Sequence, residues 1–316
     1  MQFPFALVLM ASAALAQSTT QIFNFTSYVD IENSALRPNG NLLLTTFDNG
    51  RLYTLNPSSK APEAELLAAL PGATALCGIT AIAADKFAIV GGVRGHYSYT
   101  NETLYTVDFS QNAANPTIRT VTRLPGAVML NGMASLPKQS HIVLIADSRL
   151  GYLFRVDTRT GASKVAFKDE ALTAPANATI PIGVNGLKVT GGYVYFTNSA
   201  RNTFSRIPVS ADGLKFGAIQ VISRLNAGTT GDDWDDFAID TEGVAYVAQP
   251  DNAIARISPD GQQTIVAGGG SSNIIIGPTS VQIANGGELL YVTTRGGTVD
   301  GFSYSGQVLQ VQLSGK

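Results

Sequence analysis

The sequence is poor in the residues that metal clusters and hydrolytic triads need. Cys77 is its only cysteine, which excludes an intramolecular disulfide and any cysteine-based metal cluster. We interpret Cys77 as a small buried hydrophobic residue, because only two histidines are present to activate a thiol. His96 and His141 belong to different repeat units of the chain, and His141 is expected in a solvent-exposed turn. Without a GxSxG motif, a Ser-His-Asp hydrolase is disfavoured.

Charge and long apolar runs are also scarce. Charged residues make up 14% of the 316 positions, the formal net charge is −2, and Lys and Arg do not cluster. This gives no electrostatic footprint for nucleic acid or an anionic membrane. Beyond the first sixteen residues no apolar stretch approaches the roughly 18 to 20 residues that a membrane-spanning helix needs. A small-molecule or protein partner is therefore expected, and the sequence does not fix an oligomeric state.

What the sequence does contain is a unit of about fifty residues that returns six times, a length typical of a four-stranded propeller blade. Each unit opens on a small or polar residue followed by an alternating apolar strand. The openings are Glu32, Gly78, Asn131, Asn185, Asp235 and Pro278. The repeats predict an all-β fold, a six-bladed β-propeller with four-stranded blades. In the third unit, strands are expected at 131–136, 141–147, 152–157 and 163–168.

The two ends of the chain have separate roles in this prediction. Residues 1–16 form an apolar run ending in Ala-Leu-Ala, which predicts a signal peptide, and residues 17–316 form a single propeller domain. Three sequons, at Asn24, Asn101 and Asn177, are candidate glycosylation sites and favour the secretory pathway or secretion. The strand at 19–25 is expected to close the ring by pairing near 308–313 as the outer strand of the last blade.

The blade plan places all six openings at one end of the axis, together with the loops that join the second and third strands. Four of the openings bring oxygen-bearing side chains to the floor of that pocket: Glu32, Asn131, Asn185 and Asp235. Two carboxylates and two amide oxygens suit Ca²⁺, Mg²⁺ or Mn²⁺. The alternative is that these Asn and Asp side chains cap the turn into each strand by bonding their own backbone.

The openings resemble those of the SMP-30/gluconolactonase/luciferin-regenerating superfamily of six-bladed propellers. In that family a Glu, two Asn and an Asp from four inner strands bind a metal, and IENSALRPNG, LNGM, VNGL and WDDFAIDTEG match those places. The resemblance implies that Glu32, Asn131, Asn185 and Asp235 are the ligands if a metal is bound. The usual Asp-Gly step is Asp235-Asp236 here, which leaves open which aspartate faces the axis.

A closer resemblance is to a fungal branch of secreted propellers that includes the hetero-Diels-Alderases of tropolone-sesquiterpene biosynthesis. The phrases ENSALRPNGNLLLTT, IADSRLGYLFRVDTRTG and VNGLKVTGGYVYFTN carry it. It implies a pericyclase that joins an o-quinone methide, formed from a tropolone or phenol, to an alkene. Such an enzyme takes a small hydrophobic substrate and requires no cofactor.

For that reaction we predict a set of wall and catalytic residues around the pocket. The expected apolar and stacking residues are Phe47, Tyr97, Tyr99, Trp234 and Ile276. Arg295 or His96 would polarise the quinone methide oxygen, and Glu32 or Asp235 would act as acid or base in the dehydration.

Two other functions stay open at this point. One is a metal-dependent lactonase or ester hydrolase, in which Asp235 or Asp236 moves the proton of a metal-bound water. The other is a non-catalytic binding propeller. Axial carboxylates turned away from a pocket that is filled by side chains would support the binding propeller.

Overall fold

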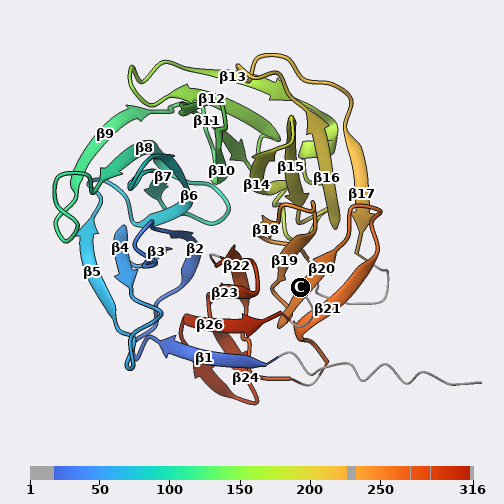
Figure 1. Ribbon diagram of the computed structural model, residues 1–316. Helices are drawn as coiled ribbons and strands as arrows, with labels where there is room; N and C mark the ends of the chain where they lie inside the picture. The colour runs from blue at the N-terminus through green and yellow to red at the C-terminus, as the bar shows by residue number, and fades with distance from the viewer. Residues whose placement is uncertain (1–17, 226–232, 271, 285, 314–316) are drawn as a thin grey trace, which may run out of the picture.

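The computed structural model describes residues 18–225, 233–270, 272–284 and 286–313. Within these ranges the chain forms six four-stranded antiparallel sheets around a central axis (Figure 1). The predicted all-β, six-bladed propeller is confirmed. The predicted signal peptide, residues 1–16, lies outside the described residues and stays a prediction. Across the ranges given above, no helix has both the length and the apolar character needed to cross a membrane.

The first three blades run in sequence order from the axis outward (Figure 1). Blade 1 contains β2 (Ile31–Leu36), β3 (Leu42–Thr46), β4 (Arg51–Leu55) and β5 (Ala64–Ala69). Blade 2 contains β6 (Ala75–Ala83), β7 (Lys86–Val93), β8 (Thr100–Asp108) and β9 (Thr117–Arg123). Blade 3 contains β10 (Leu130–Leu136), β11 (Gln139–Asp147), β12 (Tyr152–Asp157) and β13 (Ser163–Lys168).

The remaining blades repeat this plan, with one extra hairpin. Blade 4 contains β14 (Val184–Thr190), β15 (Tyr193–Asn198), β16 (Thr203–Pro208) and β17 (Gln220–Arg224). Blade 5 contains β18 (Phe237–Ile239), β19 (Ala245–Gln249), β20 (Ala253–Ile257) and β21 (Gln263–Gly268). Blade 6 contains β22 (Pro278–Ile283), β23 (Leu289–Thr294), β26 (Gln307–Gln312) and β1 (Thr19–Asn24). The hairpin β24 (Gly297–Val299) and β25 (Phe302–Tyr304) lies between β23 and β26, and a short 3₁₀ helix η1 (Glu170–Leu172) follows β13.

In blade 3 the two outer strands have the predicted bounds, and the two inner strands begin one and two residues earlier than predicted. The turn between β10 and β11 consists of Pro137 and Lys138 alone. His141 therefore lies within β11 and is half-buried, so its expected place in a solvent-exposed turn is wrong. The short hairpin turn leaves the flanking residues free to pair, which lengthens the strand.

The ring is closed by both ends of the chain, as predicted. β1 pairs antiparallel with β26, with Thr19 opposite Val311 and Asn24 opposite Gln307, and β26 pairs with β23 (Figure 1). Phe25 follows β1, and its ring lies 5.1 Å from the ring of Tyr53 in blade 1. The N-terminal strand therefore completes blade 6 and also packs against blade 1.

Apolar clusters fill the six interfaces between neighbouring blades. Each cluster of buried side chains draws its members from two adjacent blades, because alternate side chains of a strand point to opposite faces of its sheet. Cys77 is buried in the cluster between blades 2 and 3, which confirms its prediction as a small buried residue. Burial raises the pKa of its thiol well above the ordinary value.

Glycines near the axis allow the inner strands to approach one another closely. A side chain on Gly78 would overlap the carbonyl oxygen of Asn131 in blade 3, and one on Gly132 would overlap the carbonyl oxygen of Asn185 in blade 4. A Cβ on Gly186 would lie 2.6 Å from Oδ1 of Asp236 in blade 5. The glycine after each opening asparagine is therefore a position of close backbone approach.

We expect Gly132→Ala to destabilise the fold by about 3 kcal/mol, because the new Cβ meets backbone atoms that cannot rotate away. Besides the Asn185 carbonyl, it would lie 2.8 Å from the backbone nitrogen of Leu187. Urea denaturation measures the change. The matched control is Gly126→Ala, where no atom lies within 4 Å of the added Cβ, and a change below about 0.5 kcal/mol is expected. Equal stability of the two variants would contradict the close-approach argument.

The ring closure generates a second stability prediction. Phe25→Ala removes a half-buried ring that contacts Phe23 and Tyr53 at centroid distances of 4.9 and 5.1 Å. A loss of about 2 kcal/mol is expected in the same denaturation assay, below the range for a fully buried ring. Phe302→Ala removes a ring that is 69% exposed and should change the free energy of unfolding by less than about 0.5 kcal/mol. A Phe25 variant as stable as the Phe302 variant would count against the role of the N-terminal strand.

Candidate active site at the propeller axis

A cavity of about 470 Å³ opens at the end of the axis where the inner strands begin. All six blades contribute to its lining, through the openings of the inner strands and the loops between the second and third strands. This is the face that the sequence predicted for the pocket. The size falls within the usual range for a small-molecule site, about 300–1,000 Å³.

The floor of the cavity contains the four predicted oxygen-bearing residues. Glu32, Asn131, Asn185 and Asp235 all line it, each from a different blade. The side-chain Nδ2 of Asn185 donates to Ser199 Oγ at 3.0 Å, and its Oδ1 is buried without a hydrogen-bond partner among the described residues. Asn185 therefore does not cap its own backbone, and its free oxygen is available to a ligand.

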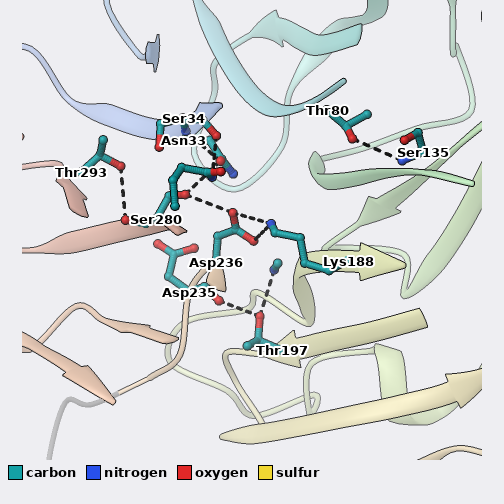
Figure 2. Close-up of polar contacts among 12 residues, drawn as sticks. Asn33, Ser34, Thr80, Ser135, Lys188, Thr197, Asp235, Asp236, Ser280 and Thr293 are labelled. Carbon is teal, nitrogen blue, oxygen red and sulfur yellow. Dashed lines mark hydrogen bonds and ion pairs between the residues drawn. The ribbon is translucent and has the colours of Figure 1, made fainter. Parts of the chain in front are cut away.

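The two adjacent aspartates have different surroundings, and only Asp235 lines the cavity. The Asp236 carboxylate lies 2.6 and 2.8 Å from Lys188 Nζ, and Ser280 Oγ donates to it at 3.1 Å. Figure 2 shows this carboxylate directed at Lys188 and Ser280, whereas the Asp235 carboxylate takes part in none of the contacts drawn. Asp236, which the sequence left as an alternative to Asp235, is thus held by an ion pair outside the cavity lining.

The backbone of Asp235 and Asp236 is held by hydrogen bonds with both neighbouring blades. Thr197 Oγ1 of blade 4 donates to the carbonyl oxygen of Asp235 at 2.7 Å, and the backbone nitrogen of Asp236 donates to Thr279 of blade 6 at 3.0 Å. Because three blades hold these two residues, the direction of the Asp235 side chain is set by the packing of the ring.

Burial in one cavity raises the pKa of the floor carboxyl groups. Burial and then the neighbouring charge of Asp30, against the opposing charges of Arg94 and Arg295, raise the pKa of Glu32 to about 8. Burial, followed by the charge of Glu32, raises the pKa of Asp235 well above its ordinary value. A proton is therefore retained among these groups near neutral pH.

Two more carboxyl groups and two arginines complete the charged part of the lining. Burial raises the pKa of both Asp30 and Asp233, and Arg295 opposes the shift in each case. Arg94 NH1 lies 3.4 Å from Asp30 Oδ2. The site thus combines four carboxyl groups with two permanent cations.

Aromatic side chains from blades 1 and 2 form one wall. Phe47, His96, Tyr97 and Tyr99 line the cavity, as predicted, and the Arg94 guanidinium lies 4.1 Å from the centroid of the Phe47 ring. The rings of Phe47 and Tyr99 meet edge to face at 6.3 Å. The predicted polarising residue Arg295 also lines the cavity.

Two of the predicted wall residues lie elsewhere. Trp234 is fully buried in the cluster with Phe204 and Phe237, between blades 4 and 5. Its neighbours Asp233 and Asp235 line the cavity, so the extended chain turns the residue between them toward the core. Ile276 is 3% exposed and outside the lining, and its backbone nitrogen donates to Gln307 Oε1 at 3.1 Å. Their prediction as substrate contacts is wrong.

The sequence reasoning missed several lining residues that a simple spacing would have found. Asp30 stands two residues before Glu32, Met129 two before Asn131, and Asp233 two before Asp235. Residues two apart in an extended chain share a face, so each belongs to the same side as the opening that follows it. The other lining residues that were not named as site residues are Tyr28, Arg94, Gly95, Ile180, Ile182, Pro250 and Thr279.

Comparison with solved structures agrees with the architecture. A luciferin-regenerating enzyme superposes with a TM-score of 0.67 at 16% identity, covering 95% of this chain and 96% of that chain. A protein from Agrobacterium tumefaciens described as the calcium-binding protein regucalcin superposes with a TM-score of 0.61 at 18% identity, covering 92% and 95%. At these identities the likeness shows the fold alone.

Comparison with curated sequences finds two relatives whose names state a reaction. A Phoma sp protein named "Putative hetero-Diels-Alderase" is 28% identical over 296 residues, covering 83% of this chain and 82% of its own length. A Sarocladium schorii protein named "Putative hetero-Diels-Alderase asR5" is 27% identical over 311 residues, covering 87% and 77%. The predicted resemblance to the hetero-Diels-Alderase branch is confirmed. No family model matches the chain.

The superfamily resemblance implies a metal, and the floor residues fit one in the kind of their donors, which all line one cavity. The charge of Glu32 raises the pKa of Asp235, and a cation would offset that repulsion. Asn185 Oδ1 is a buried acceptor without a partner in the described part of the chain. Hard oxygen donors of this kind suit Ca²⁺, Mg²⁺ or Mn²⁺.

If these donors bind a divalent cation, as the lactonase alternative requires, the purified protein contains about one ion per chain and Glu32 and Asp235 are ionised. Elemental analysis before and after chelation measures the metal content. Asn185→Leu removes the free amide oxygen and should lower the metal content, whereas Asn56→Leu replaces an exposed turn residue and should leave it unchanged. Equal metal content in both variants, or none in the parent protein before chelation, would show that the floor does not hold an ion.

Proposed function

We propose that this protein catalyses a hetero-Diels-Alder cycloaddition between an alkene and an o-quinone methide formed from a hydroxymethyl-bearing tropolone or phenol. The observation that carries the proposal is the axial cavity, in which four carboxyl groups and two arginines share the lining with aromatic and aliphatic side chains. The two sequence relatives, both named for this reaction, support the same class of enzyme.

The first step of this reaction is the loss of one water from the substrate. The hydroxymethyl oxygen gains a proton, its C–O bond breaks as water leaves, and the ring hydroxyl gives up a proton. Burial raises the pKa of both Glu32 and Asp235, and the charge of Glu32 also raises that of Asp235, so the floor retains a proton near neutral pH. One carboxyl group therefore acts as the acid and the other as the base, as in other paired-carboxyl sites.

The second step forms two bonds without a proton transfer or a cofactor. The exocyclic carbon of the quinone methide bonds to one alkene carbon, and its oxygen bonds to the other. Arg295, which lines the same cavity as Glu32 and Asp235, supplies a fixed positive charge that polarises this oxygen. The cavity contributes by holding both reactants in one orientation, an effect that reaches about 7 kcal/mol or more in well-oriented systems.

The oxygen donors of the floor support a second candidate, a metal-dependent lactonase or ester hydrolase. A bound divalent ion would polarise the ester carbonyl, and Asp235 would carry the proton of the attacking water. The structural neighbour described as calcium-binding regucalcin is consistent with this candidate. Lactone hydrolysis that chelation abolishes, with no conversion of hydroxymethyl phenols, would favour it over the cycloaddition. The binding propeller is less well supported, because the axial carboxyl groups Glu32 and Asp235 line an open cavity.

We further propose that the protein enters the secretory pathway and carries N-linked glycans. Asn24 and Asn177 are exposed, and Asn101 is half-buried with its Nδ2 donating to Gly72 O at 2.5 Å. These positions supply accessible acceptors, most openly at Asn24 and Asn177. The mass of protein secreted from a eukaryotic host, before and after glycosidase treatment, tests the proposal; an unchanged mass would refute glycosylation.

The carboxyl pair makes the central prediction. Glu32→Gln and Asp235→Asn should each lower turnover at least about a hundredfold, the usual scale for loss of a general acid or base, while the circular dichroism spectrum is retained. Glu65→Gln changes an exposed carboxylate on blade 1 and should leave turnover unchanged. Normal turnover in both floor variants would remove the pair from the mechanism.

The raised pKa of Glu32 also predicts a pH dependence with a defined sign. The pKa is about 8 in the folded protein and 4.5 ordinarily, so the folded state binds the extra proton between these values. Stability therefore falls as the pH rises from about 4.5 to about 8, and turnover that needs the protonated acid falls above pH 8. Glu32→Gln should flatten the stability profile in that window.

A further inference from the structure

The lining of the axial cavity is divided by chemical character around the ring. Its four carboxyl groups and Arg295 come from blades 1, 5 and 6. Apart from Pro250 of blade 5, its aliphatic side chains, Met129, Ile180 and Ile182, come from the connections that lead into blades 3 and 4. We call these three residues the apolar wall.

The division follows from which residue stands two positions before the opening residue of each blade. Asp30 and Asp233 stand two residues before the opening carboxylates of blades 1 and 5, and Met129 takes the equivalent place before Asn131. At blades 3 and 4 the opening residues are neutral amides, so no charge is contributed from these blades to the lining. The register of the repeat thus separates a charged side from an uncharged one.

The apolar wall is held in place by contacts on both sides of its loop. Arg149 NH1 of blade 3 donates to the carbonyl oxygen of Pro181 at 2.9 Å, and the backbone nitrogen of Ala200 in blade 4 donates to that of Ile182 at 2.8 Å. Ile182 packs against the core cluster between blades 2 and 3, which also contains Met129. The loop is therefore a fixed surface, on which aliphatic groups stay presented to the cavity.

The exposure of Ile180 in the cavity lining points to an apolar ligand. It is 37% exposed although it lines the cavity beside the buried Met129, which is 6% exposed. Covering exposed aliphatic surface with an apolar group lowers the free energy of the complex, because both apolar surfaces leave water. Methyl groups of this kind cannot satisfy the oxygens of a polar ligand.

We propose that Met129, Ile180 and Ile182 form the subsite for the hydrocarbon reactant, so that the alkene lies against blades 3 and 4 while the oxygen-bearing reactant lies at the carboxyl and arginine side. This inference rests on the proposed function, because a hetero-Diels-Alder reaction joins one reactant of each polarity. The fixed distance and direction between the two sides then determine which face of the alkene meets the heterodiene. Ile180 and Ile182 act as specificity-determining residues.

The test uses two unreactive probes and needs no turnover. Limonene serves as the alkene probe, and 2-methoxybenzyl alcohol, an ether whose capped phenol oxygen cannot form a quinone methide, serves as the oxygen-bearing probe; calorimetry gives their dissociation constants. In the full-length Ile180→Ala/Ile182→Ala protein, the dissociation constant for limonene should rise about tenfold, the scale of losing a few methylene contacts. The constant for the ether should stay within about twofold. Ile265→Ala, at a residue 52% exposed on β21, should change neither.

Each alternative outcome overturns the inference. Equal weakening of both probes would mean that the cavity is not divided, and unchanged limonene binding, or none in the parent protein, would mean that the apolar wall is not the subsite. Failure of the proposed function is seen separately, as absence of cycloaddition in the parent protein while the probes still bind with the expected split. Cycloaddition with an unchanged KM for the alkene in the double variant would reject the inference and leave the function intact.

Discussion

The site depends on how closely the inner strands approach one another at the axis. Gly78, Gly132 and Gly186 have no Cβ, which allows the backbone of each inner strand to pass against the next opening. The residues beside two of these glycines, Asn131 and Asn185, line the same cavity as Glu32 and Asp235. Larger residues would push the strands apart, and the four floor residues would no longer share one cavity. The chemistry is thus a consequence of backbone packing.

The second constraint is electrostatic. Four carboxyl groups in one buried cavity cannot all ionise, so the site retains protons that a solvated carboxylate would lose. Arg94 and Arg295 offset part of this repulsion on Glu32, whereas the charge of Asp236, although paired with Lys188, still adds to the repulsion on Glu32 and Asp235. A buried ion pair of this kind adds little net stability, but leaving Asp236 unpaired would cost several kcal/mol. Of the two adjacent aspartates, Asp236 therefore forms a structural ion pair and Asp235 lines the cavity.

Much of the fold was predictable because its signals are periodic. The six blades and the ring closure by 19–25 follow from repeat length and alternation, and both agree with the structure. The four floor residues were predictable for the same reason. Trp234 and Ile276 were not, because an aromatic or aliphatic residue in a connecting segment carries no mark of which face it occupies. The choice between Asp235 and Asp236 required knowledge of Lys188, a residue 48 positions away in the sequence.

The pairing of β1 with β26 has a consequence for how the molecule is made. The outermost strand of blade 6 is synthesised first, and its partner, residues 307–312, is synthesised almost last. The ring therefore closes only after β26 has been synthesised, and until then the edge that β26 pairs with stays open. Biosynthesis therefore favours a late, single closing event, and the neighbouring ends make this ring a natural candidate for circular permutation between any two blades.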